Sequence, residues 1–400
     1  MSNQNHSHGL KTGYQIIKLE KQFICLKPNN TIGVKKMLLH NRRVLTNVLL
    51  AVISFLLAIT IAEISLRLVW EKPQITTKPK TNWSIIPERI WTEYHPTLGW
   101  FHQKSKKAVL IKDGWSVEVN TNATGMRGVK NYSIEKPAHV TRVMSLGDSF
   151  VFGFGVKDNE TFSARLEQSN PNLEVLNFGV AGYGLDQILL SYREMGRQYK
   201  PDLVIIGIFP EQFWRSTRAF TDAGYAKPYY TLSGEHLVLH NVPTPQPFEL
   251  KHNQFPDLIE TNDVKDFFEK SILYRSFRRS LIRMGKEFGW VDPEWILGRR
   301  LLKTLITNIK ADQAQVVLVI IPPDRWVKSA RLDSLRRSLL RFAQREQVPM
   351  IDLTPFFFKA IQQSDITEYY IKNDWHWTAK GHQLATSILN DFILENQSRR

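Results

Sequence analysis

The chain has 400 residues, of which 42% are hydrophobic and 11% are aromatic. So many large apolar side chains can bury a core, which excludes an intrinsically disordered protein. The formal net charge is +15, but no zinc-finger spacing or aromatic RNA-binding motif accompanies it, so we predict no nucleic-acid partner. Basic clusters at helical spacing, which include Arg336, Arg337 and Arg341, are interpreted as solvated helix faces.

The first predicted element is an uncharged apolar run of about 19 residues, 44–62. At ~1.5 Å per residue, a helix of this length crosses a hydrocarbon core of ~30 Å. Basic residues between Lys35 and Arg43 precede the run, which predicts an N-terminus in the cytoplasm. A cleaved signal peptide and a buried core helix are the alternatives.

These features predict a single-pass membrane protein whose main domain is extracytoplasmic. The predicted parts are a cytoplasmic tail (1–43), a transmembrane signal anchor (44–62), a linker (63–94) and a globular domain (95–400). The only cysteine, Cys25, precedes the anchor. We therefore expect neither disulfides nor thiolate metal sites in the globular domain.

From about residue 140 the chain alternates between short apolar runs and helical stretches. This alternation predicts a parallel sheet that helices cover on both faces, with function at the carboxyl ends of the strands. The predicted strands are residues 143–146, 173–177, 203–208, 316–321 and 349–352. The predicted helices are residues 186–197, 329–347 and 379–394.

Two other segments have a pattern of their own. Residues 115–120 alternate between apolar and polar side chains in the way of a hairpin strand. Residues 211–300 break the strand–helix rhythm with aromatic residues, arginines and prolines. We interpret them as an insertion, which is either a lid or substrate-recognition element over the active-site face or a helical decoration of the fold.

A serine directly after a buried strand is the first candidate for chemistry. Ser149 stands in Gly-Asp-Ser-Phe after the first predicted strand, at the mouth of the sheet, where a nucleophile meets substrate. A serine hydroxyl needs a base, and His376 in the sequence Asp-Trp-His is the candidate. Asp374 is expected to fold back onto the imidazole and hold its tautomer. His382 lies inside a predicted helix and is the weaker candidate.

In their order along the chain, these motifs resemble those of the SGNH/GDSL hydrolases. The resemblance covers about residues 95–395 and rests on the motifs at 147–150, 177–184, 201–204 and 374–376. Leu-Gly-Trp at 98–100 and Asn-Ala-Thr-Gly-Met-Arg-Gly at 122–128 resemble the membrane-anchored members of that family. The resemblance implies a flavodoxin-like three-layer α/β/α sandwich with a parallel sheet.

The family also implies an oxyanion hole of three donors. They are the backbone N–H of Ser149 in a first block (147–150), a glycine of a second block (177–184), which Gly182 matches, and an asparagine side chain of a third block, which here begins at residue 209. The third block departs from the family, since Glu211 or Gln212 stands where the asparagine is expected. A carboxylate there would repel an oxyanion, whereas an amide can donate, and losing one donor costs about 10²–10³ in rate. Asn373 also stands where the family most often has its Asp.

The motifs predict a serine esterase that hydrolyses an acyl ester, with a short acyl group on a carbohydrate or lipid. An O-acyltransferase that modifies a cell-envelope polysaccharide would use the same residues. A third hypothesis is a catalytically impaired binding module. The altered third block favours it, and the intact Ser149, Gly182, Asp374 and His376 oppose it. The sequence has no evident metal site and no GxxxxGK[ST] phosphate loop, so we predict no metal and no cofactor.

Overall fold

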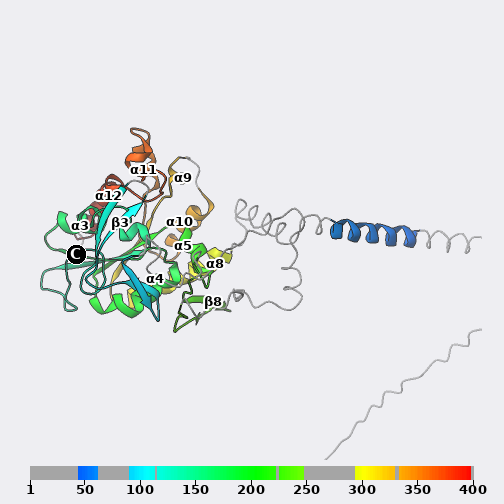
Figure 1. Cartoon of the computed structure of the whole chain (residues 1–400), viewed down its shortest axis with the longest axis horizontal. Helices are drawn as coiled ribbons and strands as arrows, with labels where there is room; N and C mark the ends of the chain where they lie inside the picture. Colours follow the sequence, from blue (N-terminus) through cyan, green and yellow to red (C-terminus); the bar gives the residue numbers. More distant parts are fainter. Residues whose placement is uncertain are drawn as a thin grey trace, which may run out of the picture. The chain divides into compact units, whose positions relative to one another are not determined.

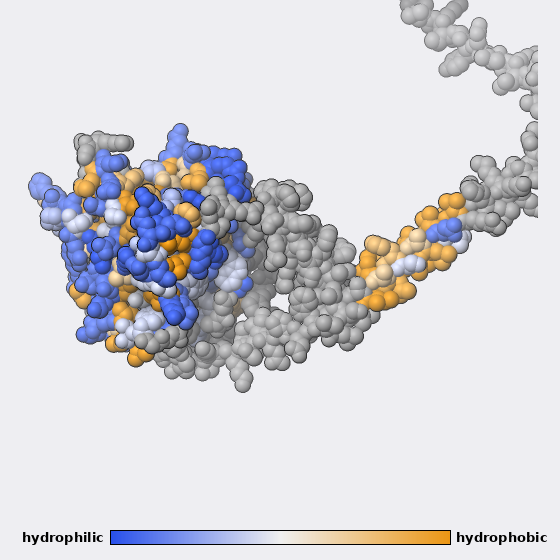
Figure 2. Space-filling view, turned by 90° about the horizontal axis from the view of Figure 1, so that it is seen from above, coloured by the Kyte–Doolittle hydropathy of each residue, from blue (hydrophilic) through white to orange (hydrophobic). Residues whose placement is uncertain are grey.

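The computed structural model describes residues 44–61, 90–112, 115–221, 225–246, 293–328 and 333–397. The chain divides into two units, Met1–Glu71 and Lys72–Arg400. In the first unit, Val44–Ile61 form a helix of 18 residues with a mean hydropathy of 2.5, and most of its surface is hydrophobic (Figure 2). By length and composition, this helix is able to cross a membrane. Most of the predicted linker over 63–94 lies outside the described residues.

The second unit contains a five-stranded parallel sheet with the strand order β11-β10-β7-β5-β6. Its strands are β5 (Thr141–Gly147), β6 (Leu173–Gly179), β7 (Leu203–Ile208), β10 (Gln315–Ile320) and β11 (Met350–Asp352). All five predicted strands are confirmed. If the five strands are numbered along the chain, their order in the sheet is 2-1-3-4-5, which is the order of flavodoxin-like sheets. In such sheets the direction in which successive strands are added reverses between the first and third strands. That reversal lies between β5 and β7.

Helices cover both faces of this sheet, as predicted for an α/β/α sandwich (Figure 1). One face packs against α4 (Leu185–Ser191), α8 (Pro293–Ala311) and α10 (Ser334–Arg345). The other face packs against α3 (Phe162–Ser169), α11 (Thr354–Ile361) and α12 (Ala379–Gln397). Successive strand residues point to opposite faces, so every strand residue in the sheet centre has a helix to pack on.

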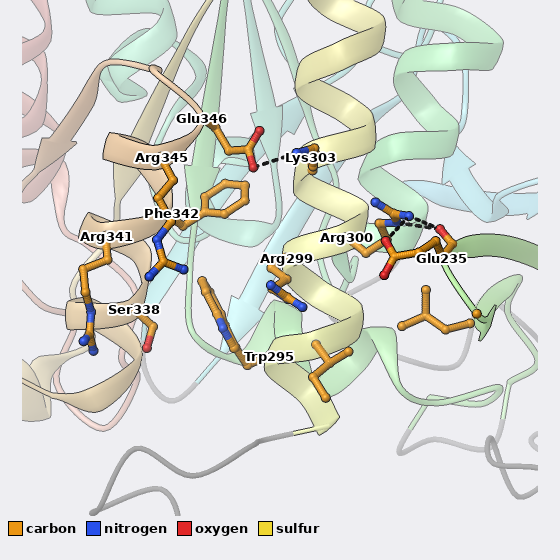
Figure 3. A pocket seen from close by; sticks show the side chains of 13 residues that line it. Glu235, Trp295, Arg299, Arg300, Lys303, Ser338, Arg341, Phe342, Arg345 and Glu346 are labelled. Carbon is orange, nitrogen blue, oxygen red and sulfur yellow. Dashed lines mark hydrogen bonds and ion pairs between the residues drawn. The ribbon is translucent and has the colours of Figure 1, made fainter.

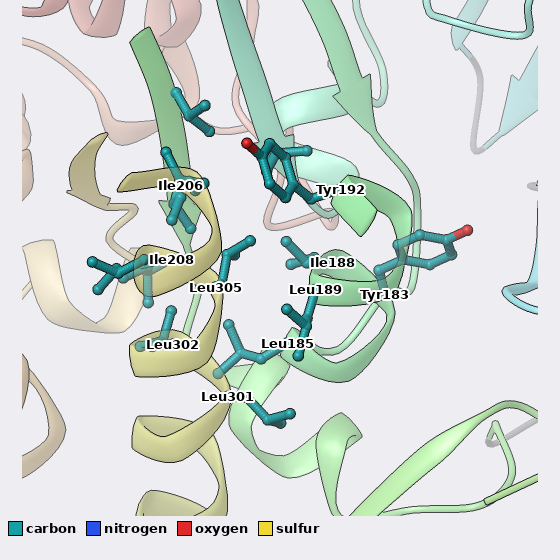
Figure 4. Close-up of a cluster of buried hydrophobic side chains, with 14 of the residues drawn as sticks. Tyr183, Leu185, Ile188, Leu189, Tyr192, Ile206, Ile208, Leu301, Leu302 and Leu305 are labelled. Carbon is teal, nitrogen blue, oxygen red and sulfur yellow. The ribbon is translucent and has the colours of Figure 1, made fainter. Parts of the chain in front are cut away.

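The first of these two layers shows how the apolar pattern is used. Leucines of α4 and α8 interlock above Ile206 and Ile208 of β7 (Figure 4). The neighbouring Ile205 faces the opposite layer. Each of these three isoleucines is at most 1% exposed, which explains why the predicted strand at 203–208 is apolar throughout.

A smaller layer packs beside the turn that carries Ser149. Its strands pair antiparallel as β1 (Thr92–His95) with β2 (Gly99–His102) and β3 (Lys107–Lys112) with β4 (Trp115–Asn120). The hairpin strand predicted at 115–120 is thereby confirmed. Leu110 and Val119 of this hairpin pack with Phe152 and Phe154, which follow Ser149 in the chain.

The predicted insertion at 211–300 is described in part. It includes α5 (Glu211–Ser216), the hairpin β8 (Tyr229–Ser233) with β9 (His236–His240), and the start of α8. Residues 247–292 lie outside the described residues. The predicted helix at 186–197 is α4 followed by a π-helical turn, Tyr192–Gly196, and a 3₁₀ turn, Arg197–Tyr199. The predicted helix at 329–347 is described from Ser334 onward, as α10.

Candidate active site

Three side chains from distant parts of the sequence meet at the carboxyl end of β5. The Ser149 hydroxyl lies 2.7 Å from Nε2 of His376, and Nδ1 of the same ring lies 2.5 Å from Oδ1 of Asp374. All three residues are buried, with exposed fractions of 6 to 8%. Because an ionised carboxylate only accepts, Nδ1 carries the proton, and Nε2 is left to accept the hydrogen bond that Ser149 donates.

The carboxylate of Asp374 is held in its charged form. Burial alone would raise its pKa, but hydrogen bonds and charge from His376, with a further bond from Lys112, hold the pKa of Asp374 well below its ordinary value. The backbone N–H of His376 donates to Oδ1 at 3.0 Å, and Nζ of Lys112 donates to Oδ2 at 3.1 Å. Both carboxylate oxygens are therefore fixed, and so is the direction in which Asp374 presents Oδ1 to the imidazole.

Aromatic rings hold the imidazole of His376 in place. Its centroid lies 5.0 Å from the ring of Phe150 and 4.6 Å from the ring of Phe154. Trp375 lies 5.5 Å away and is 38% exposed. These contacts leave the ring little freedom to turn away from Ser149.

Ser149 stands at the first position of a short helix, α2 (Ser149–Phe152). The preceding Asp148 caps this helix, because its Oδ1 accepts a hydrogen bond from the backbone N–H of Phe150 at 3.2 Å. The first N–H groups of a helix have no partner within it. The N–H of Ser149, at the first position of α2, therefore has no acceptor within the helix.

The second block is joined closely to this turn. Asn177 donates from Nδ2 to the carbonyl of Val151 at 2.8 Å and accepts from the N–H of Gly179 at 3.0 Å. A side chain on Gly179 would place its Cβ 2.2 Å from the backbone N of Phe152, so only glycine allows this approach. Gly182 follows in a half-buried turn with φ of +81°, a conformation that glycine adopts without strain.

The Leu-Gly-Trp motif fastens the loop that carries Gly182. Nε1 of Trp100 donates to the carbonyl of Ala181 at 3.1 Å, and the hydroxyl of Tyr183 donates to the carbonyl of Trp100. The two rings meet edge to face at 5.4 Å. The residues on both sides of Gly182 are thus bonded to one tryptophan, a role that the sequence motif alone did not reveal.

The third block presents neither predicted side chain as a free donor. Gln212 is fully buried, and its Nε2 donates to the carbonyl of Gly207 at 3.0 Å. Glu211 accepts from Nη2 of Arg215 at 3.0 Å. Burial raises the pKa of Glu211, against the opposing effect of Arg215, and the charge of Asp148 raises it further.

Arg215 connects the first block to the second. Its Nη1 donates to Oδ2 of Asp148 at 2.8 Å and to the carbonyl of Tyr183 at 3.3 Å. One guanidinium therefore bonds the residue before Ser149 and the residue after Gly182. Sequence reasoning missed Arg215, although its spacing of four residues from Glu211 is that of a helical ion pair.

Two further positions complete the comparison with the sequence. The weaker candidate, His382, is buried in α12, where its Nδ1 accepts from the backbone N–H of Phe162 at 3.3 Å. Burial lowers the pKa of His382 to about 3, so it packs as a neutral ring. Asn373 is exposed, with φ of +58°. Within the described residues, no group of three His, Cys, Asp or Glu side chains is arranged to hold a metal ion.

Comparisons with known proteins give matches among solved structures alone. No protein-family model matches the sequence, and no curated protein matches it. A psychrotrophic esterase from Pseudoalteromonas sp. is 14% identical, with a TM-score of 0.37 over 64% of this chain and 99% of that one. An acetylxylan esterase from Geobacillus stearothermophilus, solved as a catalytic mutant, is 14% identical, with a TM-score of 0.35 over 63% and 94%. A member of the lipolytic protein G-D-S-L family from Veillonella parvula DSM 2008 is 11% identical, with a TM-score of 0.36 over 62% and 95%.

Proposed function

We propose that this chain is a serine esterase of the SGNH/GDSL type, in which Ser149, His376 and Asp374 act as one catalytic unit. The observation that carries the proposal is the unbroken hydrogen-bond chain from the Ser149 hydroxyl through the imidazole to the Asp374 carboxylate. A nucleophile, a base and a group that orients the base are what acyl transfer requires.

In the proposed acylation step, Oγ of Ser149 attacks the ester carbonyl carbon while Nε2 of His376 takes the hydroxyl proton. The carbonyl oxygen becomes an oxyanion, and Asp374 stabilises the imidazolium that has formed. When the carbonyl is restored, the bond to the alcohol oxygen breaks and Nε2 returns its proton to that oxygen. The alcohol leaves, and the acyl group remains on Ser149.

Deacylation repeats the sequence with water. Nε2 of His376 takes a proton from the water as its oxygen attacks the acyl carbon. The bond to Oγ then breaks, Oγ recovers the proton, and the carboxylic acid leaves. The proposed substrate is an acyl ester, with a short acyl group on a carbohydrate or lipid.

The oxyanion is proposed to bind the backbone N–H groups of Ser149 and Gly182. Support for this comes from the position of Ser149 at a helix start and from the contacts that fix the loop of Gly182. Backbone donors fixed before the reaction cost no reorganisation when the charge develops. Arg215 bonds the residue before Ser149 and the residue after Gly182, and so holds these two donors at a fixed spacing.

The apolar helix Val44–Ile61 is proposed to anchor the enzyme as a single span, with the catalytic unit outside the cytoplasm. At ~1.5 Å per residue, its 18 residues extend about 27 Å, close to the thickness of a hydrocarbon core. The basic residues Arg42 and Arg43 directly before it favour a cytoplasmic N-terminus. Retention in the membrane pellet after alkaline carbonate extraction is expected, and release into the supernatant would contradict the anchor.

The decisive experiment is covalent labelling of the full chain, purified in detergent, by a fluorophosphonate probe. Such a probe reacts with a serine only when a neighbouring base activates it. We expect labelling of the wild type and none of Ser149→Ala. The control is Ser387→Ala, which removes an exposed serine of α12 and should label like the wild type. A folded wild-type chain that takes no label would refute the esterase proposal.

A further inference from the structure

A groove lies between α8 and α10, and its lining includes no residue of the triad. It encloses about 490 Å³, and its lining carries five cationic side chains and two carboxylates, a net of three positive charges. The cations come as two stripes, Arg299, Arg300 and Lys303 on α8 and Arg341 and Arg345 on α10. Figure 3 shows Arg299 and Arg345 pointing from opposite helices toward the space beside Trp295.

The two carboxylates of the groove each pair with one of its five cations. Arg300 forms an ion pair with Glu235 at 2.6 Å, and Lys303 forms one with Glu346 at 3.0 Å. The side chains of Arg299 and Arg345 have neither an ion pair nor a hydrogen bond to any residue that the structure describes, and both are exposed. Two guanidinium groups therefore face the groove with their donors available.

This arrangement works against the stability of the two helices. Arg299 and Lys303 are four residues apart on α8, as are Arg341 and Arg345 on α10. Like charges at this spacing repel each other on a helix surface, and packing α8 beside α10 brings both stripes to one groove. A solvated helix face, as first interpreted for Arg341, would not require the two stripes to converge, whereas a bound anion would offset their repulsion.

The floor of the groove is aromatic. Trp295 is half-buried, stacks on Phe213 at 5.7 Å and meets the edge of Phe342 at 6.1 Å. The hydroxyl of Ser338 lines the groove as well. Arginine forks match the paired oxygens of carboxylates and phosphates, and an indole with its apolar surface accessible suits the apolar face of a sugar ring.

We propose that this groove binds an anionic saccharide, a sugar chain that bears carboxylate or phosphate groups. Arg299 and Arg345 bind the anionic groups, and Trp295 contacts a sugar ring between them. The site is separate from the triad, but Phe213, which supports Trp295, directly follows Gln212 of the third block.

The test measures the Kd of the full chain, in detergent, for three glycans by isothermal titration calorimetry. Oligogalacturonate supplies carboxylates, phosphomannan supplies phosphates, and dextran is neutral. We expect binding of at least one anionic glycan, no binding of dextran, and weakening by about tenfold or more in the double variant Arg299→Gln/Arg345→Gln. The matched control is Lys104→Gln/Lys359→Gln, which removes two exposed positive charges elsewhere and should change the Kd less than about twofold.

Two results would overturn the proposal. They are the absence of binding to both anionic glycans and equal weakening in the two double variants. Failure here is distinguishable from failure of the esterase proposal, because calorimetry needs no turnover and fluorophosphonate labelling needs no saccharide.

Discussion

The loop of residues 373–378 and the third block, residues 209–216, border the same edge of the sheet but use their carboxylates in opposite ways. In the first, His376 and Lys112 hold the pKa of Asp374 below its ordinary value, and the charge faces the imidazole. In the second, burial raises the pKa of Glu211, and its charge is tied to Arg215. In the first region the carboxylate bonds the imidazole of His376, whereas in the second the carboxylate bonds an arginine, and the two regions would serve nucleophile activation and oxyanion binding in the proposed esterase.

The largest expected fall in kcat comes from a substitution in the loop of residues 373–378. Asp374→Asn should lower kcat by about 10⁴-fold, because an amide in place of the carboxylate favours the wrong tautomer of His376. Steady-state hydrolysis of p-nitrophenyl acetate by the full chain measures it. The neighbouring Asn373→Gly, which keeps the positive φ, is the control and should remain within a few-fold of the wild type. An equal loss in both variants would show that the effect comes from a disturbed loop and not from the Asp374 carboxylate.

Substitutions of Arg215 in the third block should lower kcat less than Asp374→Asn does. Arg215→Met leaves the buried carboxylate of Asp148 without its cation and removes one hydrogen bond to the carbonyl of Tyr183. We expect kcat to fall by about 10²-fold with a smaller change in KM, the loss typical of one misplaced oxyanion donor. Arg215→Lys, which keeps the charge but lacks the fork, should recover part of this loss.

The matched variant in the same block is Glu211→Gln, which retains an acceptor for Arg215. Its kcat should stay within about threefold of the wild type, since Glu211 itself faces Arg215 rather than the reacting group. If Glu211→Gln and Arg215→Met lose activity equally, the carboxylate takes part in catalysis and the contrast between the two regions disappears.

A smaller effect is expected at Lys112, which bonds Asp374 from outside the loop of residues 373–378. Lys112→Met removes the donor to Oδ2 of Asp374, but Oδ1 keeps both of its bonds to His376. Because the side chain of Lys112 is 28% exposed, we expect kcat to fall only about threefold to tenfold. Lys107→Met, on the same strand but paired with the exposed Glu118, should have no measurable effect. A loss of 10²-fold or more at Lys112 would show that the carboxylate depends on it.

The sequence predicted those parts of the fold and site that depend on local patterns. Apolar runs with β-branched residues marked all five strands, because strands that helices cover on both sides have no polar face to interrupt the run. Ser149 could be singled out because it directly follows such a strand. The pair Asp374 and His376 could be singled out because a separation of two residues in a loop lets a carboxylate fold back onto a ring.

Contacts between residues far apart in the chain could not be predicted, because no local sequence pattern marks them. Lys112 lies 262 residues from Asp374 in the chain, and nothing near Lys112 marks it as different from the other lysines of its hairpin. The register of the third block was ambiguous by one residue, since the strand gives way there to a helix. Only the fold shows that Gln212 points inward to the carbonyl of Gly207 while Glu211 turns to Arg215.

The smallest expected effect on turnover belongs to His382, which tests whether the last block holds one working histidine or two. Burial lowers the pKa of His382 to about 3, whereas the ring takes up a proton near pH 6.5 in the unfolded chain. Between these values the unfolded chain binds the extra proton. The stability that the neutral ring contributes is therefore complete above about pH 6.5 and is lost as the pH falls toward 3, by roughly 3 kcal/mol at pH 4.

His382→Asn keeps an acceptor for the N–H of Phe162 and removes the titrating ring. It should therefore lower stability at pH 7, where the packing of His382 against Phe162 and Trp377 is lost, but flatten the decline between pH 7 and pH 4. Denaturant unfolding of the full chain, followed by tryptophan fluorescence at both pH values, measures the difference. The exposed His139→Asn is the control and should leave the decline unchanged. Turnover near that of the wild type at pH 7 is expected for the remaining folded His382→Asn, and a loss comparable with that of Asp374→Asn would mean that the proton path from Ser149 extends beyond His376.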